Sequence, residues 1–455
     1  MRAILRIRQP FMIAAALLGT VLACPTNAQQ SAPGFVRDAE VENILRVYGA
    51  PLFRAAGFEP NAIRLHLIAD KSLNAFVANG LNIYFHTGLL VRADDASQVI
   101  GVMAHELGHI TGGHLARTED RIRQAQNQSI ATFLLGAGAA ILTGRGDAAA
   151  AVIAGGQNAV MASFLQYSQT QESAADQAGL KFMDASGVSA RGLGEFLRVL
   201  ENQELLAVGR QDPYMRSHPV TRQRIDTVEA QVARSPYADA KLPPTIVEMH
   251  KRMRVKLAAF LDPVPTVLQR HPESDTSIVN RYARAIGLYR KPDLPAALAT
   301  IDGLLAQEPK NPYFHELRGQ MLFENGKAAE SVEPLQTAVR LLPDNALLKV
   351  LLSQVLIETN DQAAIRQAIV QLEEARKIED DNLSAVRFLA IAYGRDGQLA
   401  MAALSQAEFA LGTGRNSEAK VQADKALQGL KSGSPAWLRA QDLKSQAEIR
   451  SKASQ

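Results

Sequence analysis

The sequence predicts a mostly helical α+β protein with a small sheet in its first half and a helical solenoid in its second half. Three observations predict this. Two short segments of alternating apolar and polar residues precede an amphipathic helix, a motif recurs about every 34 residues beyond residue 275, and 455 residues are too many for one ordinary hydrophobic core.

The composition favours a chain that folds in water and excludes several classes of protein. Hydrophobic residues make up 47% and charged residues 21%, which fits neither a polytopic membrane protein nor a disordered tail. The single cysteine, Cys24, excludes a disulfide framework and any structural zinc module built from cysteines. A metal would therefore have to be held by histidines and carboxylates.

Residues 1–28 are expected to be a secretory signal peptide. Three arginines precede an apolar stretch, residues 11–22, that is too short to span a bilayer comfortably, and small residues follow it up to Ala28. Residues 21–24 also resemble a lipoprotein box, in which Cys24 would carry a lipid anchor. Removing the three arginines takes the formal net charge from +3 to 0, so a nucleic-acid partner has no electrostatic support.

Two strands and one helix are predicted between residues 63 and 113. Residues 63–70 and 81–86 alternate apolar and polar side chains, as half-buried strands do. The helix is expected to start near Asp94 and Asp95, whose carboxylates suit a helix N-terminus, and to weaken at Gly112 and Gly113. One long helix should therefore follow directly after the sheet.

Two segments rich in glycine and alanine follow this helix. Residues 131–144 and 148–156 are both too short to cross a membrane. They are expected to pack over the core as helices or to form a flexible cover to a cleft; a hairpin in peripheral contact with a membrane is the alternative. A further helix is expected from about residue 164 to 180, and prolines mark residues 263–275 as a linker.

Residues 276–455 contain the repeat. Asn311 recurs as Asn345 and Asn382, each within a polar turn, at intervals of 34 and 37 residues. Small residues between them fit close helix crossings, and Pro343 would end a helix. The pattern resembles the tetratricopeptide repeat, and it predicts about four helical pairs with a degenerate end, stacked around a concave surface for a partner.

The motif His105-Glu106-Leu107-Gly108-His109 carries the chemistry. Residues four apart share one face of a helix, so both imidazoles can bind one ion while Glu106 lies beside the open coordination position. The spacing predicts one zinc ion per chain with Glu106 as a general base. Two histidines are too few for a catalytic zinc, which usually takes three protein ligands.

Two residues compete for the place of the third ligand. His114 follows two glycines that could break the helix, but it comes one residue early for the extended motif with a third histidine. Glu172 lies 63 residues beyond His109, and Asp176 follows one turn later, where it could accept the ring N–H of a ligating histidine. The spacing alone leaves both candidates open.

These motifs resemble those of the HtpX-like and CAAX-prenyl-protease-like zinc metallopeptidases. The resemblance implies a zincin-type domain of the gluzincin class over residues 29–262, in which Glu172 is the third zinc ligand. It also implies that residues 71–76 and the following strand, residues 82–85, provide an edge strand to which an extended substrate adds. Gln169 departs from the family, which usually has an arginine at that position.

His218 lies in a His-Pro segment, residues 217–225, that is similar to a segment of the same family. It precedes Pro219, so a loop could turn it toward the cleft. His218 could donate to the oxyanion of a tetrahedral intermediate, or it could occupy the open zinc position and keep the enzyme latent. A packing or capping role without catalysis is the third possibility.

A secretory signal, a metallopeptidase domain and tetratricopeptide repeats together resemble a group of periplasmic proteases of Gram-negative bacteria. The resemblance implies a zinc endopeptidase with a chaperone-like role in outer-membrane protein assembly and quality control. Its clients would be unfolded or misassembled outer-membrane polypeptides, and its repeat groove would engage them or the assembly machinery. The alternatives are a latent or non-proteolytic repeat scaffold, and a lipid-anchored metallopeptidase of another pathway.

Overall fold

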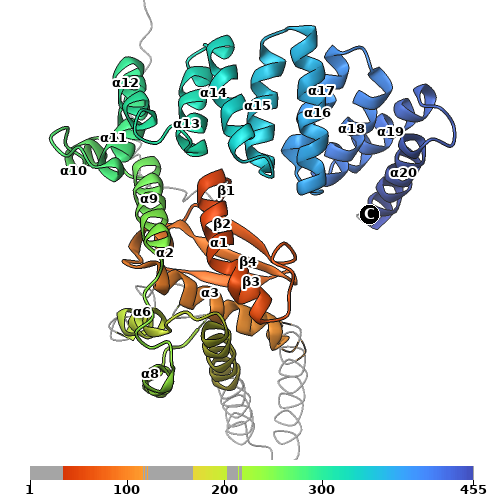
Figure 1. Ribbon diagram of the computed structural model, residues 1–455. Coiled ribbons are helices and arrows are strands. Elements are labelled where there is room, and N and C mark those ends of the chain that lie inside the picture. The colour runs from red at the N-terminus through yellow and green to blue at the C-terminus, as the bar shows by residue number, and fades with distance from the viewer. Residues whose placement is uncertain are drawn as a thin grey trace, which may run out of the picture.

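The structure, a computed structural model, describes a small sheet with its helices and an arc of paired helices beside them (Figure 1). The described residues are 34–115, 117, 120, 168–201, 214 and 218–453. The expected signal peptide, Cys24 and the segments rich in glycine and alanine lie outside them. The prediction of a mostly helical α+β chain with one small sheet is confirmed.

One mixed sheet of four strands is described in the first half of the chain. Its order is β1 (Phe35–Val36), β2 (Arg64–Ile68), β4 (Asn82–His86) and β3 (Ala75–Ala78). β2 and β4 run parallel, and each outer strand is antiparallel to its neighbour. β2 and β4 are the two strands predicted from alternation. The expectation that residues 82–85 provide the edge strand is wrong, because they belong to the internal strand β4 and β3 forms the edge.

Helices α1 (Ala39–Ala55), α2 (Thr87–Arg92) and α3 (Ala96–Thr111) share one hydrophobic core with the sheet. The residues that alternate inward from β2 and β4 supply its sheet side: Leu65, Leu67, Ile83 and Phe85. The Asp95 carboxylate accepts a hydrogen bond from the backbone N–H of Ser97 and so caps α3. The predicted start of this helix is therefore confirmed.

The remaining elements of the first half lead the chain toward the repeats. They are the helix of residues 168–185, α6 (Arg191–Glu201), α8 (Arg222–Arg234), α9 (Pro244–Leu261) and α10 (Val264–Arg270). α9 joins two cores, because Met253 and Leu257 pack in the first core while Ala259 packs with the first repeat. α10 lies within the expected linker, and its Val267 packs with the same repeat.

Paired helices form the arc over the sheet in Figure 1. The recurring asparagines cap the first helix of three successive pairs: the side chains of Asn311, Asn345 and Asn382 each accept a backbone N–H. The tetratricopeptide-like architecture is confirmed. The pairs are α11 (Ile278–Arg290) with α12 (Leu294–Leu305), α13 (Pro312–Glu324) with α14 (Ala328–Leu341), α15 (Ala346–Glu358) with α16 (Gln362–Ile378), α17 (Leu383–Arg395) with α18 (Leu399–Gly412), and α19 (Asn416–Gly429) with α20 (Pro435–Ala453).

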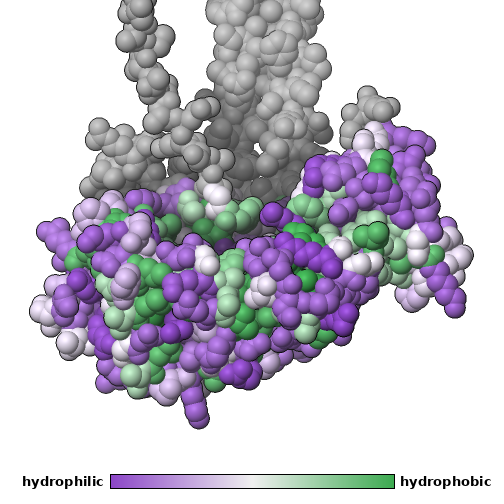
Figure 2. Space-filling view, turned by 90° about the horizontal axis from the view of Figure 1, so that it is seen from above, coloured by the Kyte–Doolittle hydropathy of each residue, from purple (hydrophilic) through white to green (hydrophobic). Residues whose placement is uncertain are grey.

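Hydrophilic residues cover most of the described surface that Figure 2 presents, and smaller hydrophobic patches lie between them. Among the described helices, none is both long enough and apolar enough to span a membrane.

Buried polar contacts join the two halves. Lys256 on α9 places its Nζ 2.9 Å from Asp38 Oδ2 and 3.3 Å from Glu40 Oε2 at the start of α1. The Tyr282 hydroxyl, on the first repeat helix, donates to Glu40 Oε2 at 2.7 Å. The same buried carboxylate therefore connects α1 to α9 and to α11.

A second set of contacts joins the sheet to the middle of the arc. Arg37 donates to Glu379 in the turn between α16 and α17, with Nη2 2.9 Å from Oε1. Arg64, the first residue of β2, pairs with Asp380 and Asp381 of the same turn. The acidic turn that marks the third period of the repeat thus contacts the sheet.

Candidate metal centre

α3 carries His105, Glu106 and His109 into the interior of the first domain. Their exposed fractions are 0%, 0% and 6%. The Nε2 atoms of His105 and His109 lie 3.1 Å apart, as expected for two imidazoles on successive turns that face one point. The helix thus presents both ring nitrogens to the same small volume.

Gly108 allows a second helix to approach this face of α3. A Cβ atom at Gly108 would lie 2.4 Å from the carbonyl oxygen of Ala175, closer than any side chain permits. Glycine at this position therefore lets the helix of residues 168–185 pack directly on α3. The contact places Glu172 and Asp176, which lie on either side of Ala175, against the histidines.

The Glu172 carboxylate completes a set of three converging side chains that could hold a metal ion. Its Oε2 lies 3.3 Å from His105 Nε2, and its Oε1 lies 3.3 Å from His109 Nε2. A tetrahedral zinc ion with bonds of about 2.0–2.1 Å holds its ligand atoms roughly 3.3 Å apart. The spacing of these side chains therefore fits zinc.

His218 adds a fourth nitrogen to this set. Its Nδ1 lies 3.2 Å from both carboxylate oxygens of Glu172 and 3.3 Å from His105 Nε2. The ring of Tyr214 stacks on the His218 ring with 4.5 Å between ring centroids, and the backbone N–H of His218 donates to the Tyr214 carbonyl at 2.7 Å. Ligand atoms of His105, His109, Glu172 and His218 all lie within 4.8 Å of one another.

Asp176 holds the ring of His105 from behind. His105 Nδ1 lies 2.8 Å from Asp176 Oδ1, so a ring N–H can donate to this oxygen and leave Nε2 for a metal. Burial alone would raise the pKa of Asp176, but hydrogen bonds from Arg224 and His105 outweigh it and lower the pKa to about 2. The carboxylate is therefore ionised at neutral pH.

The carboxylate of Glu106 is buried and makes no hydrogen bond within the described residues. Neither oxygen of its buried carboxylate has a hydrogen-bond partner within the described part of the chain, and the ring of His218 lies nearby with Nε2 3.5 Å from Oε1. An unpartnered buried carboxylate is costly, so its presence beside four metal-type ligands supports a bound cation and a polar substrate at this place.

His114 lies behind His109 and outside the converging set. Its Nδ1 is 2.9 Å from His109 Nδ1, on the side of the ring away from Glu172. The structure thus brings Glu172 to the histidine pair, while His114 reaches only the far nitrogen of one of them. Gln169, the departure from the family pattern, has an exposed side chain.

Arg224 is a residue of this site that the sequence analysis did not predict. It is 3% exposed, and it contacts both Asp176 and Glu172; its Nη1 lies 2.8 Å from Glu172 Oε2. Burial alone would raise the pKa of Glu172, but the charge of His218 and hydrogen bonds from the histidines hold it well below its usual range. The available signal was the position of Arg224 a few residues after the His-Pro pair.

Comparison with known proteins agrees with this geometry. Residues 37–232 match the model of peptidase family M48. The β-barrel assembly-enhancing protease of Yersinia pestis is 24% identical over 343 residues, which cover 73% of this chain and 68% of that protein. The protein of the same name from Escherichia coli (strain K12) is 25% identical over 338 residues, which cover 72% of this chain and 67% of that protein.

Comparison with solved structures also matches part of the chain. A thermophilic tetratricopeptide-repeat protein of Thermus thermophilus is 18% identical, and the alignment covers 37% of this chain and 98% of that chain with a TM-score of 0.24.

Proposed function

We propose that this chain is a periplasmic zinc endopeptidase that serves outer-membrane protein assembly and quality control, because residues 37–232 match the model of peptidase family M48. The observation that carries the proposal is the buried group of His105, His109, Glu172 and His218 beside the carboxylate of Glu106. Similarity to β-barrel assembly-enhancing proteases supports the outer-membrane part.

His105, His109 and Glu172 hold the zinc ion in this proposal, and Asp176 fixes the ring of His105. When bound, zinc supplies Lewis-acid chemistry toward water and toward the carbonyl of the scissile peptide bond. Glu106 accepts a proton from the attacking water and returns it to the leaving amine. Its full burial strengthens its interaction with every charge that develops nearby.

His218 acts as a latch in this proposal. Its Nδ1 lies beside the proposed ligand atoms, 3.3 Å from His105 Nε2, so it could serve as a further ligand to the ion. The backbone N–H of Tyr214, in the same segment, donates to the carbonyl of Leu73 at 3.4 Å, just before the edge strand β3. Release of Tyr214 and His218 would withdraw this nitrogen from the proposed ligands and free the Leu73 carbonyl, to which an extended substrate could bond.

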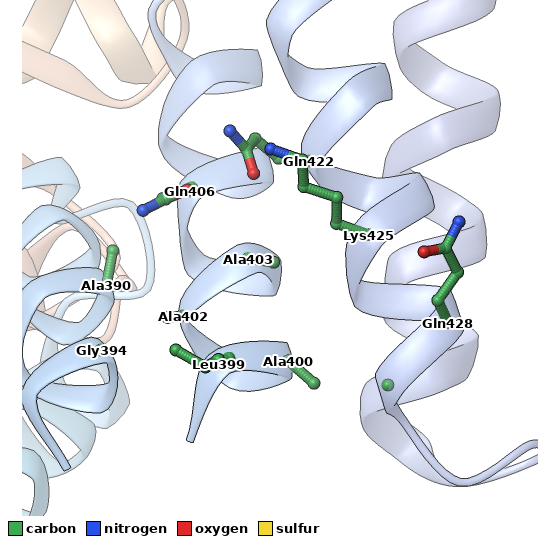
Figure 3. A pocket seen from close by; sticks show the side chains of 11 residues that line it. Ala390, Gly394, Leu399, Ala400, Ala402, Ala403, Gln406, Gln422, Lys425 and Gln428 are labelled. Atoms are coloured by element: carbon green, nitrogen blue, oxygen red, sulfur yellow. The ribbon is translucent and has the colours of Figure 1, made fainter. Parts of the chain in front are cut away.

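The repeat helices supply the surface for client polypeptides or the assembly machinery. A hollow of about 480 Å³ lies between α17, α18 and α19 (Figure 3). It is lined by small and apolar side chains together with four long polar ones, Gln406, Gln422, Lys425 and Gln428. Amide side chains can both donate to and accept from a peptide backbone, which suits a chaperone-like surface for varied sequences.

A latent or non-proteolytic scaffold is the second candidate function, and the position of His218 favours it. A histidine that is stacked on a tyrosine and grouped with the proposed ligands would compete with substrate for the ion as long as His218 stays in place. This candidate shares the repeat surface with the first and differs only in the absence of cleavage.

Cleavage of an unfolded outer-membrane β-barrel polypeptide by the purified protein tests the proposal. The protein is stripped with a chelator and then reloaded with one equivalent of zinc, and both forms are incubated with the polypeptide. We expect cleavage by the reloaded form alone. Binding of the polypeptide without cleavage by the zinc-loaded form would favour the scaffold, and the absence of both binding and cleavage would contradict the proposal.

A further inference from the structure

His114 contacts the metal centre but has no part in the proposed mechanism. It is 5% exposed, and its ring meets the His109 ring edge to face, with 5.0 Å between centroids and 78° between planes. Its Nδ1 lies 2.9 Å from His109 Nδ1, within hydrogen-bond distance. Two imidazole nitrogens at this distance must share one hydrogen, so one ring donates and the other accepts.

The direction of this hydrogen bond follows from the other face of His109. Its Nε2 faces the ligand cluster, 3.3 Å from Glu172 Oε1 and 3.1 Å from His105 Nε2. An imidazole that binds a metal through Nε2 must carry its hydrogen on Nδ1. His109 is therefore the donor, and the acceptor is the lone pair on His114 Nδ1.

The local backbone is built to hold the His114 ring at this place. α3 ends at Thr111, and Gly113 has a φ of 61°, a left-handed conformation that turns the chain back toward the helix. A Cβ atom at Gly112 would lie 2.3 Å from His114 Nε2, so the ring occupies space that only a glycine leaves free. Gln171 Nε2 donates to the His114 carbonyl at 3.3 Å from the neighbouring helix.

We propose that His114 is a positioning residue that accepts the Nδ1 hydrogen of His109 and thereby fixes the tautomer and ring orientation in which His109 binds zinc through Nε2. The two ligand histidines are then supported differently. His105 donates to the Asp176 carboxylate, and His109 donates to a neutral ring. This inference rests on the proposed role of His109 as a zinc ligand, but it does not require that the protein cleave any substrate.

Zinc affinity of two His114 variants tests the inference in the full-length protein. His114→Phe keeps an aromatic ring and removes the acceptor, whereas the amide oxygen of His114→Asn can take the place of Nδ1. Loss of such a partner of a ligating histidine typically weakens metal binding by about 10–100-fold. We expect a zinc dissociation constant raised by this factor in His114→Phe and nearly unchanged in His114→Asn, measured by competition with a chelator.

A matched control and a direct measurement keep the test decisive. His66→Phe, which changes a histidine of the same domain that contacts Asn82 in the sheet, should bind zinc as the unchanged protein does. In the zinc-loaded unchanged protein, nitrogen NMR of labelled histidine should find the hydrogen on His109 Nδ1 and none on His114 Nδ1. A hydrogen on His114 Nδ1, or equal zinc affinity in His114→Phe, would overturn the inference.

The outcome separates this inference from the proposed function. Tight zinc binding that depends on a hydrogen-bond acceptor at residue 114, in a protein that cleaves nothing, would support the positioning role and contradict the peptidase. Loss of zinc from both His114 variants, to the extent expected for a removed ligand, would contradict the positioning role. The cleavage assay would still test the proposed function independently.

Discussion

The Arg224 guanidinium donates hydrogen bonds to both carboxylate oxygens of Asp176, from Nε to Oδ2 at 2.6 Å and from Nη2 to Oδ1 at 2.9 Å. The same Oδ1 lies 2.8 Å from His105 Nδ1. A chain of charge-assisted hydrogen bonds thus runs from α8 through the helix of residues 168–185 to α3. Arg224 also donates to the carbonyl of Pro219, next to His218. One side chain therefore positions both Asp176, which contacts His105, and the backbone beside His218.

Replacing Arg224 should destabilise the first domain strongly. Arg224→Met would leave Asp176 and Glu172 buried without their cation, and breaking a buried ion pair costs about 3–5 kcal/mol. Denaturant unfolding measures this loss in the free energy of unfolding. The matched control is Arg222→Met, because its side chain is 71% exposed and exposed pairs contribute about 1 kcal/mol or less. Equal losses in the two variants would contradict the importance given to Arg224.

Replacing Glu172 should release zinc more completely than replacing His114. Glu172→Gln exchanges an anionic ligand for a neutral amide, so we expect the zinc dissociation constant to rise by more than the roughly 100-fold upper range for a hydrogen-bond partner of a ligand. Chelator competition measures both variants. Glu229→Gln, which changes a carboxylate on α8 with a 39% exposed side chain, is the control. Unchanged zinc affinity in Glu172→Gln would exclude it as the third ligand.

Removing the His218 ring should raise activity if it is the latch. His218→Ala opens the fourth coordination position, and we expect cleavage of unfolded polypeptide to increase about tenfold, which corresponds to about 1.4 kcal/mol. Initial rates at equal zinc content measure the change, with His315→Ala in the repeat domain as the control. A fall in rate would instead make His218 a donor to the oxyanion.

The junction of the two halves should respond to pH through Glu316. Burial raises the pKa of this carboxyl to about 8, and Lys256, whose Nζ lies 3.9 Å from Oε2, opposes the shift only in part. Oε2 has no hydrogen-bond partner within the described residues. Asp38 and Glu40 crowd the same lysine and raise the pKa further.

The sign of the effect follows from which state binds the proton more tightly. Between the ordinary value of 4.5 and about 8, the folded protein keeps the Glu316 proton and the unfolded chain does not, so stability falls as the pH rises through this window. Glu316→Gln removes this dependence. We expect the difference in Tm, variant minus unchanged protein, to increase between pH 5 and pH 9. The control is Glu330→Gln, at a carboxylate with a 60% exposed side chain, and parallel curves for all three proteins would contradict the account.

The periodicity of apolar residues in the sequence predicts some helices and strands of the structure but not others. β2, β4 and α3 follow from alternation and from helical spacing because each buries one face against the core. β1 and β3 have two and four residues, too few for a period, and they exist because β2 and β4 offer them backbone partners. α1 contains Gly49 and Pro51, which weaken a helical pattern.

The glycine in α1 has a cause that only the tertiary structure reveals. A Cβ atom at Gly49 would lie 2.4 Å from the Phe53 ring and 2.8 Å from the sulfur of Met103 on α3. The close packing of the two helices therefore takes precedence over helix propensity at this residue.

The residues of the metal centre likewise differ in how far the sequence predicts their arrangement. His105, Glu106 and His109 are neighbours on one helix, so their spacing in the sequence fixes their spacing in space. The choice between Glu172 and His114 depends on how closely two helices approach, which Gly108 and Ala175 decide. The role of Arg224 depends on contacts with residues about 50 positions away, for which a single sequence has no periodic signal.

The most direct test of the account compares the unchanged protein with Glu106→Gln at equal measured zinc content. Both proteins should bind zinc, because Glu106 is not among the ligand atoms that converge on the ion. We expect only the unchanged protein to cleave an unfolded β-barrel polypeptide, because the amide cannot accept a proton from water. Equal cleavage by the two proteins at equal zinc content would contradict the assignment of Glu106 as the base and, with it, the proposed mechanism.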